Sequence, residues 1–253
     1  MKIFRAILFT VLTASIFIPQ TGCGPKRISY DGFDSSKFFS LPELYGMKTY
    51  RDLTEAMQEP DQVYKFLLFG KEYKEVPDEI YNFKYLNTLE LSSNKLTDLP
   101  EYIGDMQYLQ GLYLTANEYT ELPSPILNIP NLKRLRMGEN KFDHFPVELT
   151  EIETLEEIYF DRQSISAIPD ELYEMEQIKI LKLDNNRIDT LKPDIINWQN
   201  LEVLNVKNNE LRYLPKEISQ LKNLRTLNFK GNKIPMSVGD SLRDIMPDVK
   251  IEY

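Results

Sequence analysis

The stretch Leu86-Asn-Thr-Leu-Glu-Leu-Ser-Ser-Asn94 returns along this chain every 23 residues. Its first, fourth and sixth places are apolar and its ninth place is asparagine, while the other places vary from copy to copy. A fixed period of this length indicates a solenoid, in which each repeat contacts only its neighbours. Further clear copies begin at Leu109, Leu132, Ile178, Leu201 and Leu224, a looser copy begins at Leu155, and a degenerate copy begins at Val63.

Apolar and variable residues alternate within each copy, which is the pattern of a β-strand with one buried face. Eight copies in phase predict that these strands stack side by side into one parallel sheet, about 4.8 Å apart. Each asparagine follows its strand where the chain turns, and a carboxamide can pair with both the donors and the acceptors of a buried turn. The predicted column is Asn94, Asn117, Asn140, Asn186, Asn209 and Asn232, with Gln163 in the looser copy.

The return half of each repeat carries Leu-Pro-x-x-Ile, as in the segments that start at Leu99 and Leu214. Proline prevents a long helix there, so we expect turns or one-turn helices on the convex side. Trp198 falls at an inward position of this layer and is predicted to be packing rather than binding.

Both open ends of a solenoid need a cover. Residues 40–62 are the predicted N-terminal cap, with a helix over 50–58 that buries Leu53, Ala56 and Met57. Residues 235–253 are the predicted C-terminal cap, with a helix over 237–246 and a last edge strand over 249–251. The helix is expected to bury Val238, Leu242, Ile245 and Met246.

These motifs make residues 63–234 resemble the leucine-rich repeat family, in the class with 23-residue repeats and a Leu-Pro-x-x-Ile return. The resemblance implies an α/β solenoid with a curved parallel sheet on its concave face, through which it binds partners. It implies no reaction and no cofactor. The carboxylates are scattered by repeat phase and mark no acid–base pair, so we expect no enzyme.

Composition narrows the partners further. The chain has 30 basic and 39 acidic residues, a net charge of −9, which argues against nucleic acid because phosphate binding needs a basic stripe. Cys23 and His144 are the only residues of their types. They allow no disulfide within the chain, no Cys/His metal site and no Cys–His catalytic pair. We expect His144 at the surface.

The first residues have the features of an export signal. Lys2 and Arg5 precede an apolar run over 6–18 that is too short to cross a bilayer comfortably. Gly22-Cys23 follows, and residues 1–22 with this cysteine resemble a bacterial lipoprotein signal. That resemblance implies acylation of Cys23, such as by palmitate, and Gly24 favours the outer membrane, with the periplasmic and surface-facing sides both open. The alternative is an ordinary signal peptide with an incidental cysteine. Beyond Cys23, residues 24–39 follow neither period, so 23–39 is predicted to be the lipidated tether.

The variable strand positions of the repeats face outward and would meet a partner. Tyrosine and arginine gather at the centre of this face, and these residue types dominate interface energies. Gly138 is expected to leave room for a partner side chain, and the cap to hide Leu67 and Phe69. The predicted binding residues are Tyr113, Arg134, Arg136, Tyr159, Asp161, Arg162, Lys182 and Asp184.

The leading hypothesis is therefore a monomeric, lipid-anchored module of the bacterial cell envelope that binds a protein or peptide. A solvated sheet face with cross-strand cation–π and ion pairs is the alternative for the same residues. An envelope scaffold and a carbohydrate-binding module are the alternatives for the whole protein.

Overall fold

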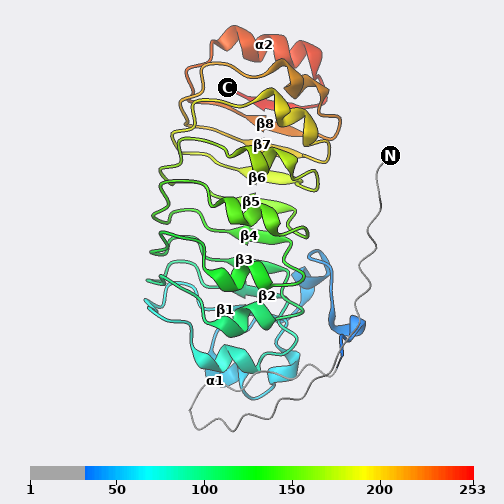
Figure 1. The fold of residues 1–253 in the computed structure, drawn as a ribbon. Helices are drawn as coiled ribbons and strands as arrows, with labels where there is room; N and C mark the ends of the chain where they lie inside the picture. Colours follow the sequence, from blue (N-terminus) through cyan, green and yellow to red (C-terminus); the bar gives the residue numbers. More distant parts are fainter. Residues whose placement is uncertain (1–31) are drawn as a thin grey trace, which may run out of the picture.

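The computed structural model describes residues 32–253 as a curved stack of repeats with one nine-stranded sheet (Figure 1). Every strand pairs in parallel with the next, and from β1 to β8 each step advances 23 residues, as in Leu89 beside Leu112 beside Leu135. The predicted leucine-rich repeat solenoid is confirmed. The strands are β1 (Lys65–Leu67), β2 (Thr88–Glu90), β3 (Gly111–Tyr113), β4 (Arg134–Arg136), β5 (Glu157–Tyr159), β6 (Ile180–Lys182), β7 (Val203–Asn205), β8 (Thr226–Asn228) and β9 (Lys250–Glu252).

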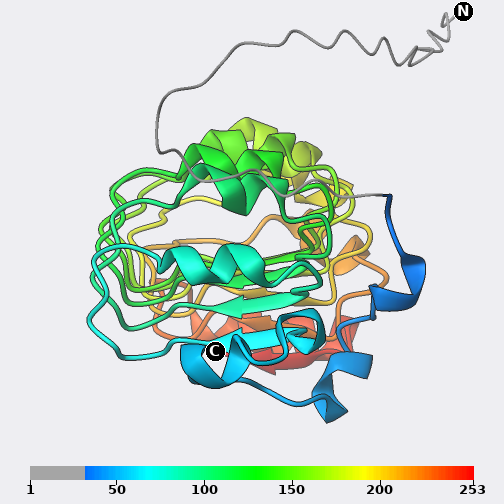
Figure 2. The same cartoon turned by 90° about the horizontal axis from the view of Figure 1, so that it is seen from below.

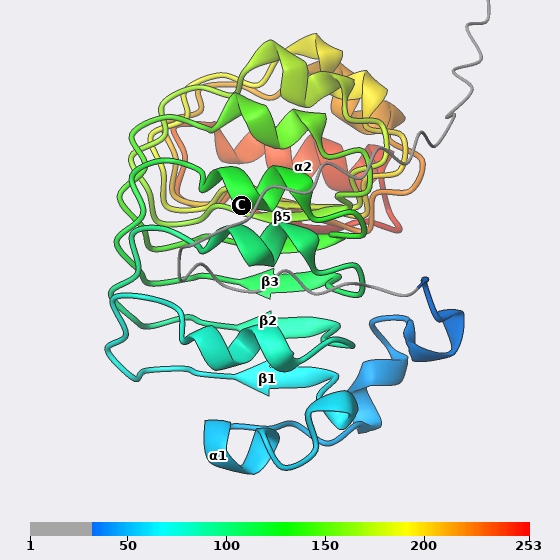
Figure 3. The same ribbon diagram turned by 60° about the horizontal axis from the view of Figure 1, so that its bottom comes forward.

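The opposite face of the stack carries one short 3-10 helix per repeat, as Figures 2 and 3 show. Trp198 packs in this layer as predicted: it is fully buried, its Nε1 donates to the Leu172 carbonyl at 2.9 Å, and it stacks on Tyr173. Each helix begins at the repeat's proline or directly after it, because proline suits a first turn and limits its extension. The convex helices are η4 (Asp78–Asn82), η5 (Glu101–Asp105), η6 (Ser124–Asn128), η7 (Val147–Glu151), η8 (Asp170–Glu174), η9 (Pro193–Asn197) and η10 (Lys216–Gln220).

The asparagine column is confirmed. Asn94 donates to the carbonyls of Leu68 at 2.7 Å and Leu91 at 2.9 Å, and its Oδ1 accepts the backbone N–H groups of Lys71 and Tyr73. One side chain thus satisfies four backbone groups and ties two neighbouring repeats together.

The residue before each column position has a left-handed backbone, which the repeat pattern alone did not predict. Their φ angles lie between 53° and 74°, a region that costs free energy for every residue except glycine. In the described repeats these residues are Gly70, Ser93, Ala116, Glu139, Arg162, Asn185, Asn208 and Gly231.

The N-terminal cap differs from its prediction. Tyr50 forms a parallel bridge with Phe66, so the helix begins later than predicted. This helix, α1 (Leu53–Ala56), has four residues, and Asp52 caps its start by accepting the Glu55 N–H. Ala56 is buried, but Met57 is exposed, so the predicted apolar face is only partly right. The cap also contains η2 (Glu43–Gly46) and η3 (Pro60–Gln62).

The segment just before this cap packs against the flank of the repeats. Phe33 stacks on the Tyr108 ring at 4.9 Å, and the N–H of Asp34 donates to the Tyr108 hydroxyl at 2.6 Å. Further along, after η1 (Ser35–Lys37), Asn87 accepts the Phe39 N–H at 3.2 Å. The predicted tether therefore ends before Phe33 rather than at residue 39, because these aromatic side chains find partners on the array. The predicted signal peptide (residues 1–22), Cys23 and residues 24–31 lie outside the described residues.

The C-terminal cap is α2 (Met236–Ile245) followed by β9, which pairs with β8 as the predicted edge strand. Leu242 and Met246, four residues apart, are buried, whereas Ile245 is exposed and its predicted burial is wrong. Ile245 lies off the helix face that meets the last repeat. Within residues 32–253, no helix combines the length and apolarity needed to cross a bilayer.

Candidate functional site

The parallel register brings the central predicted residues into one row. Tyr113 lies beside Arg136, Arg136 beside Tyr159 and Tyr159 beside Lys182, each on the next strand from β3 to β6. Because a parallel sheet repeats its side-chain direction at equivalent positions, all four share the outward face. We call these four residues the central row.

Aromatic rings hold the cation at the middle of this row. The guanidinium carbon of Arg136 lies 5.0 Å from the centroid of the Tyr113 ring and 4.3 Å from that of Tyr159, and the Lys182 amine lies 5.1 Å from the latter. Tyr159 is only 8% exposed. Cation–π contacts orient Arg136 without using its N–H donors.

Arg136 donates no hydrogen bond to any residue of 32–253, and its buried Nε is without a partner there. Buried or half-buried donors of charged groups are normally satisfied, since leaving one unpaired costs free energy. The terminal nitrogens of this guanidinium likewise donate to no side chain or backbone group of residues 32–253.

Arg134, two residues earlier on the same strand, is occupied internally. It forms a bidentate pair with Glu157 at 2.5 and 2.7 Å and donates to the Tyr113 hydroxyl at 3.1 Å. The Tyr159 hydroxyl also donates to Glu157, at 2.9 Å. Arg134 and Glu157 therefore fix both tyrosines of the row, and Arg134 serves as a positioning residue.

Burial and hydrogen bonds both shift the pKa values of this network away from neutral pH. Desolvation opposes the charge on Arg134, but the hydrogen bonds to Glu157 and Tyr113 outweigh it and raise its pKa above the usual value. Desolvation, together with Glu157, raises the pKa of Tyr159 to about 12. Arg134 is thus charged and Tyr159 neutral near neutral pH.

The acidic pair beside the row fills the space predicted to be open. A side-chain carbon built on Gly138 would lie 2.5 Å from Oδ1 of Asp161, so the expected room for a partner side chain is already taken. Desolvation and then the neighbouring Asp184 raise the pKa of the Asp161 carboxyl. Asp184 in turn accepts from Asn205 Nδ2 at 2.7 Å.

Arg162 does not join the row. It occupies the left-handed turn position after β5, with φ of 55°, and its ion-pair partner is Glu139 of the previous repeat. The residues predicted to form one surface therefore fall into two sets. The first is the central row with the Arg134–Glu157 ion pair that holds it, and the second is the Asp161–Asp184 pair. Arg162 belongs to neither set.

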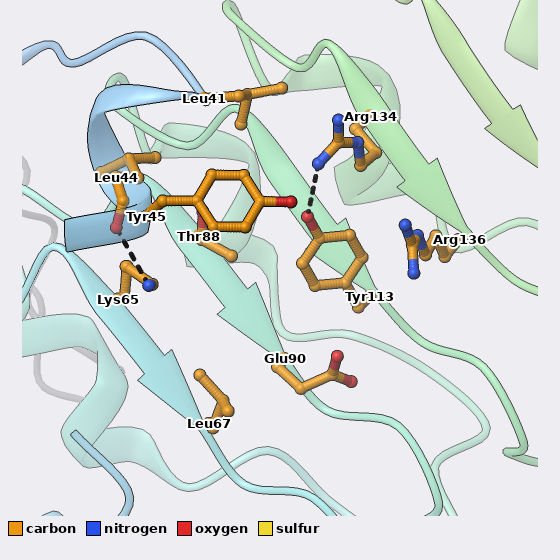
Figure 4. Close-up of a pocket in the computed structure, with 10 residues that line it drawn as sticks. All are labelled: Leu41, Leu44, Tyr45, Lys65, Leu67, Thr88, Glu90, Tyr113, Arg134 and Arg136. Carbon is orange, nitrogen blue, oxygen red and sulfur yellow. Dashed lines mark hydrogen bonds between the residues drawn. The ribbon is translucent and has the colours of Figure 1, made fainter. Parts of the chain in front are cut away.

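A pocket beside the row was not predicted. It has a volume of about 270 Å³ and lies between η2 of the cap and the first four strands (Figure 4). Leu67 is half-buried and forms part of its wall, so the cap covers Leu67 only in part, and it leaves Phe69 60% exposed. The lining residues are Leu41, Leu44, Tyr45, Lys65, Leu67, Thr88, Glu90, Tyr113, Arg134 and Arg136.

Apolar residues at 41, 44 and 45 in the predicted cap were the available signal for this wall, but their spacing did not say that they would overhang the sheet. Glu90 also lines the pocket. Desolvation raises the pKa of its carboxyl and outweighs the hydrogen bonds from the side chain and backbone of Ser92 and the charge of Arg136.

The structure of residues 32–253 gives no support for a histidine-based site or a metal site. His144 is exposed, as predicted, and pairs with Asp143 at 2.5 Å. No group of three or more His, Cys, Asp or Glu side chains in this part of the chain is arranged to hold a metal ion.

Solved structures similar to this chain are repeat proteins. Internalin C2 of Listeria monocytogenes is 20% identical, with a TM-score of 0.65 over 78% of this chain and 82% of its own. The plant peptide hormone receptor RGFR1, solved with RGF2, is 25% identical, with a TM-score of 0.54 over 74% of this chain. The ectodomain of the Arabidopsis thaliana receptor kinase GASSHO1/SCHENGEN3, solved with Casparian strip integrity factor 2, is 24% identical, with a TM-score of 0.53 over 70% of this chain.

The chain spans 31% of the RGFR1 chain and 22% of the GASSHO1/SCHENGEN3 chain. A search of curated protein sequences gave no match. Two family models match, one described as a leucine-rich repeat region over residues 77–184 and one as a leucine-rich repeat over residues 176–234. Together with the nine-stranded parallel solenoid, these matches establish that the chain belongs to the leucine-rich repeat proteins.

Proposed function

We propose that this protein is an interaction module that binds a protein or peptide on its concave face, centred on the central row. The observation that carries this proposal is Arg136, whose guanidinium is held between two tyrosine rings and yet donates no hydrogen bond within residues 32–253. Tyr113 adds apolar area that a partner can cover, whereas the buried ring of Tyr159 holds the Arg136 guanidinium, and both rings are fixed by Arg134 and Glu157. A pre-ordered aromatic and arginine surface loses little entropy on binding.

The similar structures support binding as the general role. Leucine-rich repeat proteins commonly mediate protein–protein interaction, and the RGFR1 and GASSHO1/SCHENGEN3 structures each contain a bound factor. Those receptors are much longer than this chain, so their factors are not taken as its partners. The proposal for this chain rests on the central row.

We further propose that the module is attached to the outer membrane of a bacterial cell through acylated Cys23. The supporting observation is the order of a basic start, a short apolar run and Gly22-Cys23. Growth with an alkyne-bearing palmitate analogue should label the native chain, and the Cys23→Ser variant should carry no label. Labelling that survives in this variant would refute acylation at Cys23, and protease treatment of intact cells would report the side of the membrane.

The binding proposal is tested by photocrosslinking in intact cells, with a photoreactive amino acid in place of Lys182. The native background should give a discrete adduct that mass spectrometry can identify. Adding Arg136→Glu and Tyr159→Ala should abolish the adduct, because the acceptor site and one aromatic wall are both removed. Circular dichroism and thermal unfolding of the double variant would establish that the domain is still folded.

The matched control lies on the convex side. Glu101→Lys and Glu171→Lys, both in 3-10 helices of that layer, should leave the adduct unchanged. If instead these changes abolish crosslinking and the row variant retains it, the protein is a scaffold that uses its outer surface. If the adduct carries glycan and no peptide, the carbohydrate-binding alternative holds.

A further inference from the structure

The pocket beside the central row is built from two parts of the chain that are distant in sequence. Leu41, Leu44 and Tyr45 come from the cap and overhang the strands, and Leu67 lies on the opposite wall (Figure 4). The ring of Tyr45 stands at the mouth and is 84% exposed. A volume of about 270 Å³ is below that of sites for drug-sized ligands and suits a single apolar side chain.

The cations of the pocket are not equivalent. The Lys65 amine donates to the Leu44 carbonyl at 3.0 Å, so this lysine ties the overhang to β1. Arg134 is paired with Glu157 in two hydrogen bonds. Only Arg136 has a guanidinium that donates to none of the described residues, so it is the cation that a ligand would meet.

Glu90 supplies the opposite charge on the other side of Tyr113 (Figure 4). Its Oε1 accepts the Ser92 N–H at 2.8 Å, and a carboxylate has room for further donors. The pocket thus offers a donor in Arg136 and an acceptor in Glu90, and the charges of these two groups cancel, while the Lys65 amine is directed at the Leu44 carbonyl. An anion would be attracted by the first and repelled by the second, whereas a neutral amide complements both with its carbonyl and its N–H.

We propose that this pocket is the subsite for one uncharged apolar residue of a bound peptide, whose side chain enters between Tyr45 and Leu67 while its amide groups pair with Arg136 and Glu90. This inference rests on the proposed function, since it names the part of the partner that would lie beside the central row. It also assigns a role to the cap, which forms one wall of the site.

Saturation-transfer NMR on the full chain provides the test, with N-acetyl-leucinamide as the probe. The probe should receive saturation and bind with a dissociation constant in the range of about 1 mM, which corresponds to roughly 4 kcal/mol. N-acetylglycinamide, which lacks the apolar side chain, should bind much more weakly. N-acetyl-leucine, whose carboxylate would face Glu90, should also bind several-fold more weakly than the amide.

Three variants locate the binding. Tyr45→Ala removes an exposed wall and should weaken N-acetyl-leucinamide several-fold, whereas Phe69→Ala removes an exposed aromatic ring outside the pocket and should change nothing. Glu90→Gln should reduce the preference for the amide over the free acid, because the repelling charge is lost. Each variant is compared at one pH and ionic strength.

Several outcomes would overturn the inference. The first is that N-acetyl-leucine binds the native chain more tightly than N-acetyl-leucinamide does. The second is that N-acetyl-leucinamide binds the Tyr45→Ala variant as tightly as the native chain. The third is that neither amide receives saturation at its solubility limit. Loss of amide binding with an intact row-dependent crosslink would refute the pocket and spare the proposed function. Amide binding without any row-dependent crosslink would refute the proposed function and leave the pocket as a separate site.

Discussion

The first five strands and the last four strands share one backbone but present different outward surfaces. In β3 to β5 the fifth-place side chains are Tyr113, Arg136 and Tyr159, and the side chain of Arg136 donates no hydrogen bond to residues 32–253. In β7 and β8 the same place holds Asn205 and Asn228. Asn205 donates to Asp184, Asn228 donates to Glu252, and each accepts the N–H of the residue two places on.

Under the proposed function, this difference places the binding surface on the first five strands. Where polar side chains satisfy one another, a partner must break existing hydrogen bonds to make new ones and gains little. Where a cation is oriented by aromatic faces, its donors remain for the partner. The caps sharpen the contrast, because η2 overhangs the first strands and makes a pocket, whereas α2 lies at the other end of the stack (Figure 1).

The two halves should differ in their outward surfaces and not in their cores. The largest expected effects are therefore losses of stability on removing a core side chain, and these should be equal in both halves. Phe83 in the first half and Trp198 in the second are fully buried. Phe83→Ala and Trp198→Ala should each lower the free energy of unfolding by about 3–5 kcal/mol, from lost burial and the cavity left behind. Urea unfolding followed by circular dichroism measures both. A loss below about 1 kcal/mol in either half would mean that the core is not uniform along the stack.

The next effect separates the two halves by the burial of their ion pairs. Arg134 and Glu157 have side chains 19% and 13% exposed, whereas Lys233 and Glu210 are about half exposed. Glu157→Gln should lower the free energy of unfolding by about 2 kcal/mol, because it leaves a half-buried guanidinium without its counter-charge. Glu210→Gln should cost at most about 0.5 kcal/mol. Equal losses in parallel urea titrations would contradict the view that the first half is the pre-ordered one.

A smaller effect concerns the left-handed position, which both halves share. Gly231 has φ of 74° and Arg162 has φ of 55°. Gly231→Ala should destabilise by about 1 kcal/mol, and Arg162→Gly should stabilise by up to about 1 kcal/mol, because glycine alone adopts this φ without steric cost. Thermal unfolding measures both, and Arg162→Ala is the control that removes the same ion pair while keeping the strained backbone.

The smallest effect is a difference in the sign of the pH dependence. Desolvation raises the pKa of Glu90 in the folded state, so its ionisation destabilises the fold, and the penalty begins as pH rises through the unfolded-state pKa. Glu90→Gln should therefore stabilise at neutral pH, with a gain that fades in acid.

Glu252 at the other end behaves oppositely. The hydrogen bond and charge of Lys250 lower its pKa, so its ionisation stabilises the fold above the unfolded-state pKa, and this contribution is lost as pH falls through the folded-state value. Glu252→Gln should be less stable than the native chain at neutral pH and equal to it in acid. Urea titrations at several pH values compare the two, and the same sign for both variants would contradict the assignment.

Much of this architecture could be predicted because the same pattern of apolar residues occurs in eight copies. The apolar places of one copy are ambiguous between helix and strand, but eight copies in phase leave one arrangement that buries them all. Each cap occurs only once, so no second copy could correct the prediction of its helix bounds and buried residues. The helix over 50–58 shrank to four residues because Tyr50 pairs with Phe66, a contact between residues 16 positions apart that no local pattern encodes.

The strands, the asparagine turns, the convex prolines and the order of the outward side chains all follow from the 23-residue period, so they can be read from the repeat alone. Which polar side chains are already paired becomes known only from the folded chain. Arg134 and Arg136 differ in whether their N–H donors are already used, and this depends on distances across neighbouring strands. Glu157 is close enough to accept hydrogen bonds from Arg134, whereas Arg136 contacts the faces of two tyrosine rings. The overhang of η2 that closes the pocket is likewise a contact between distant residues, so it exists only once the chain has folded.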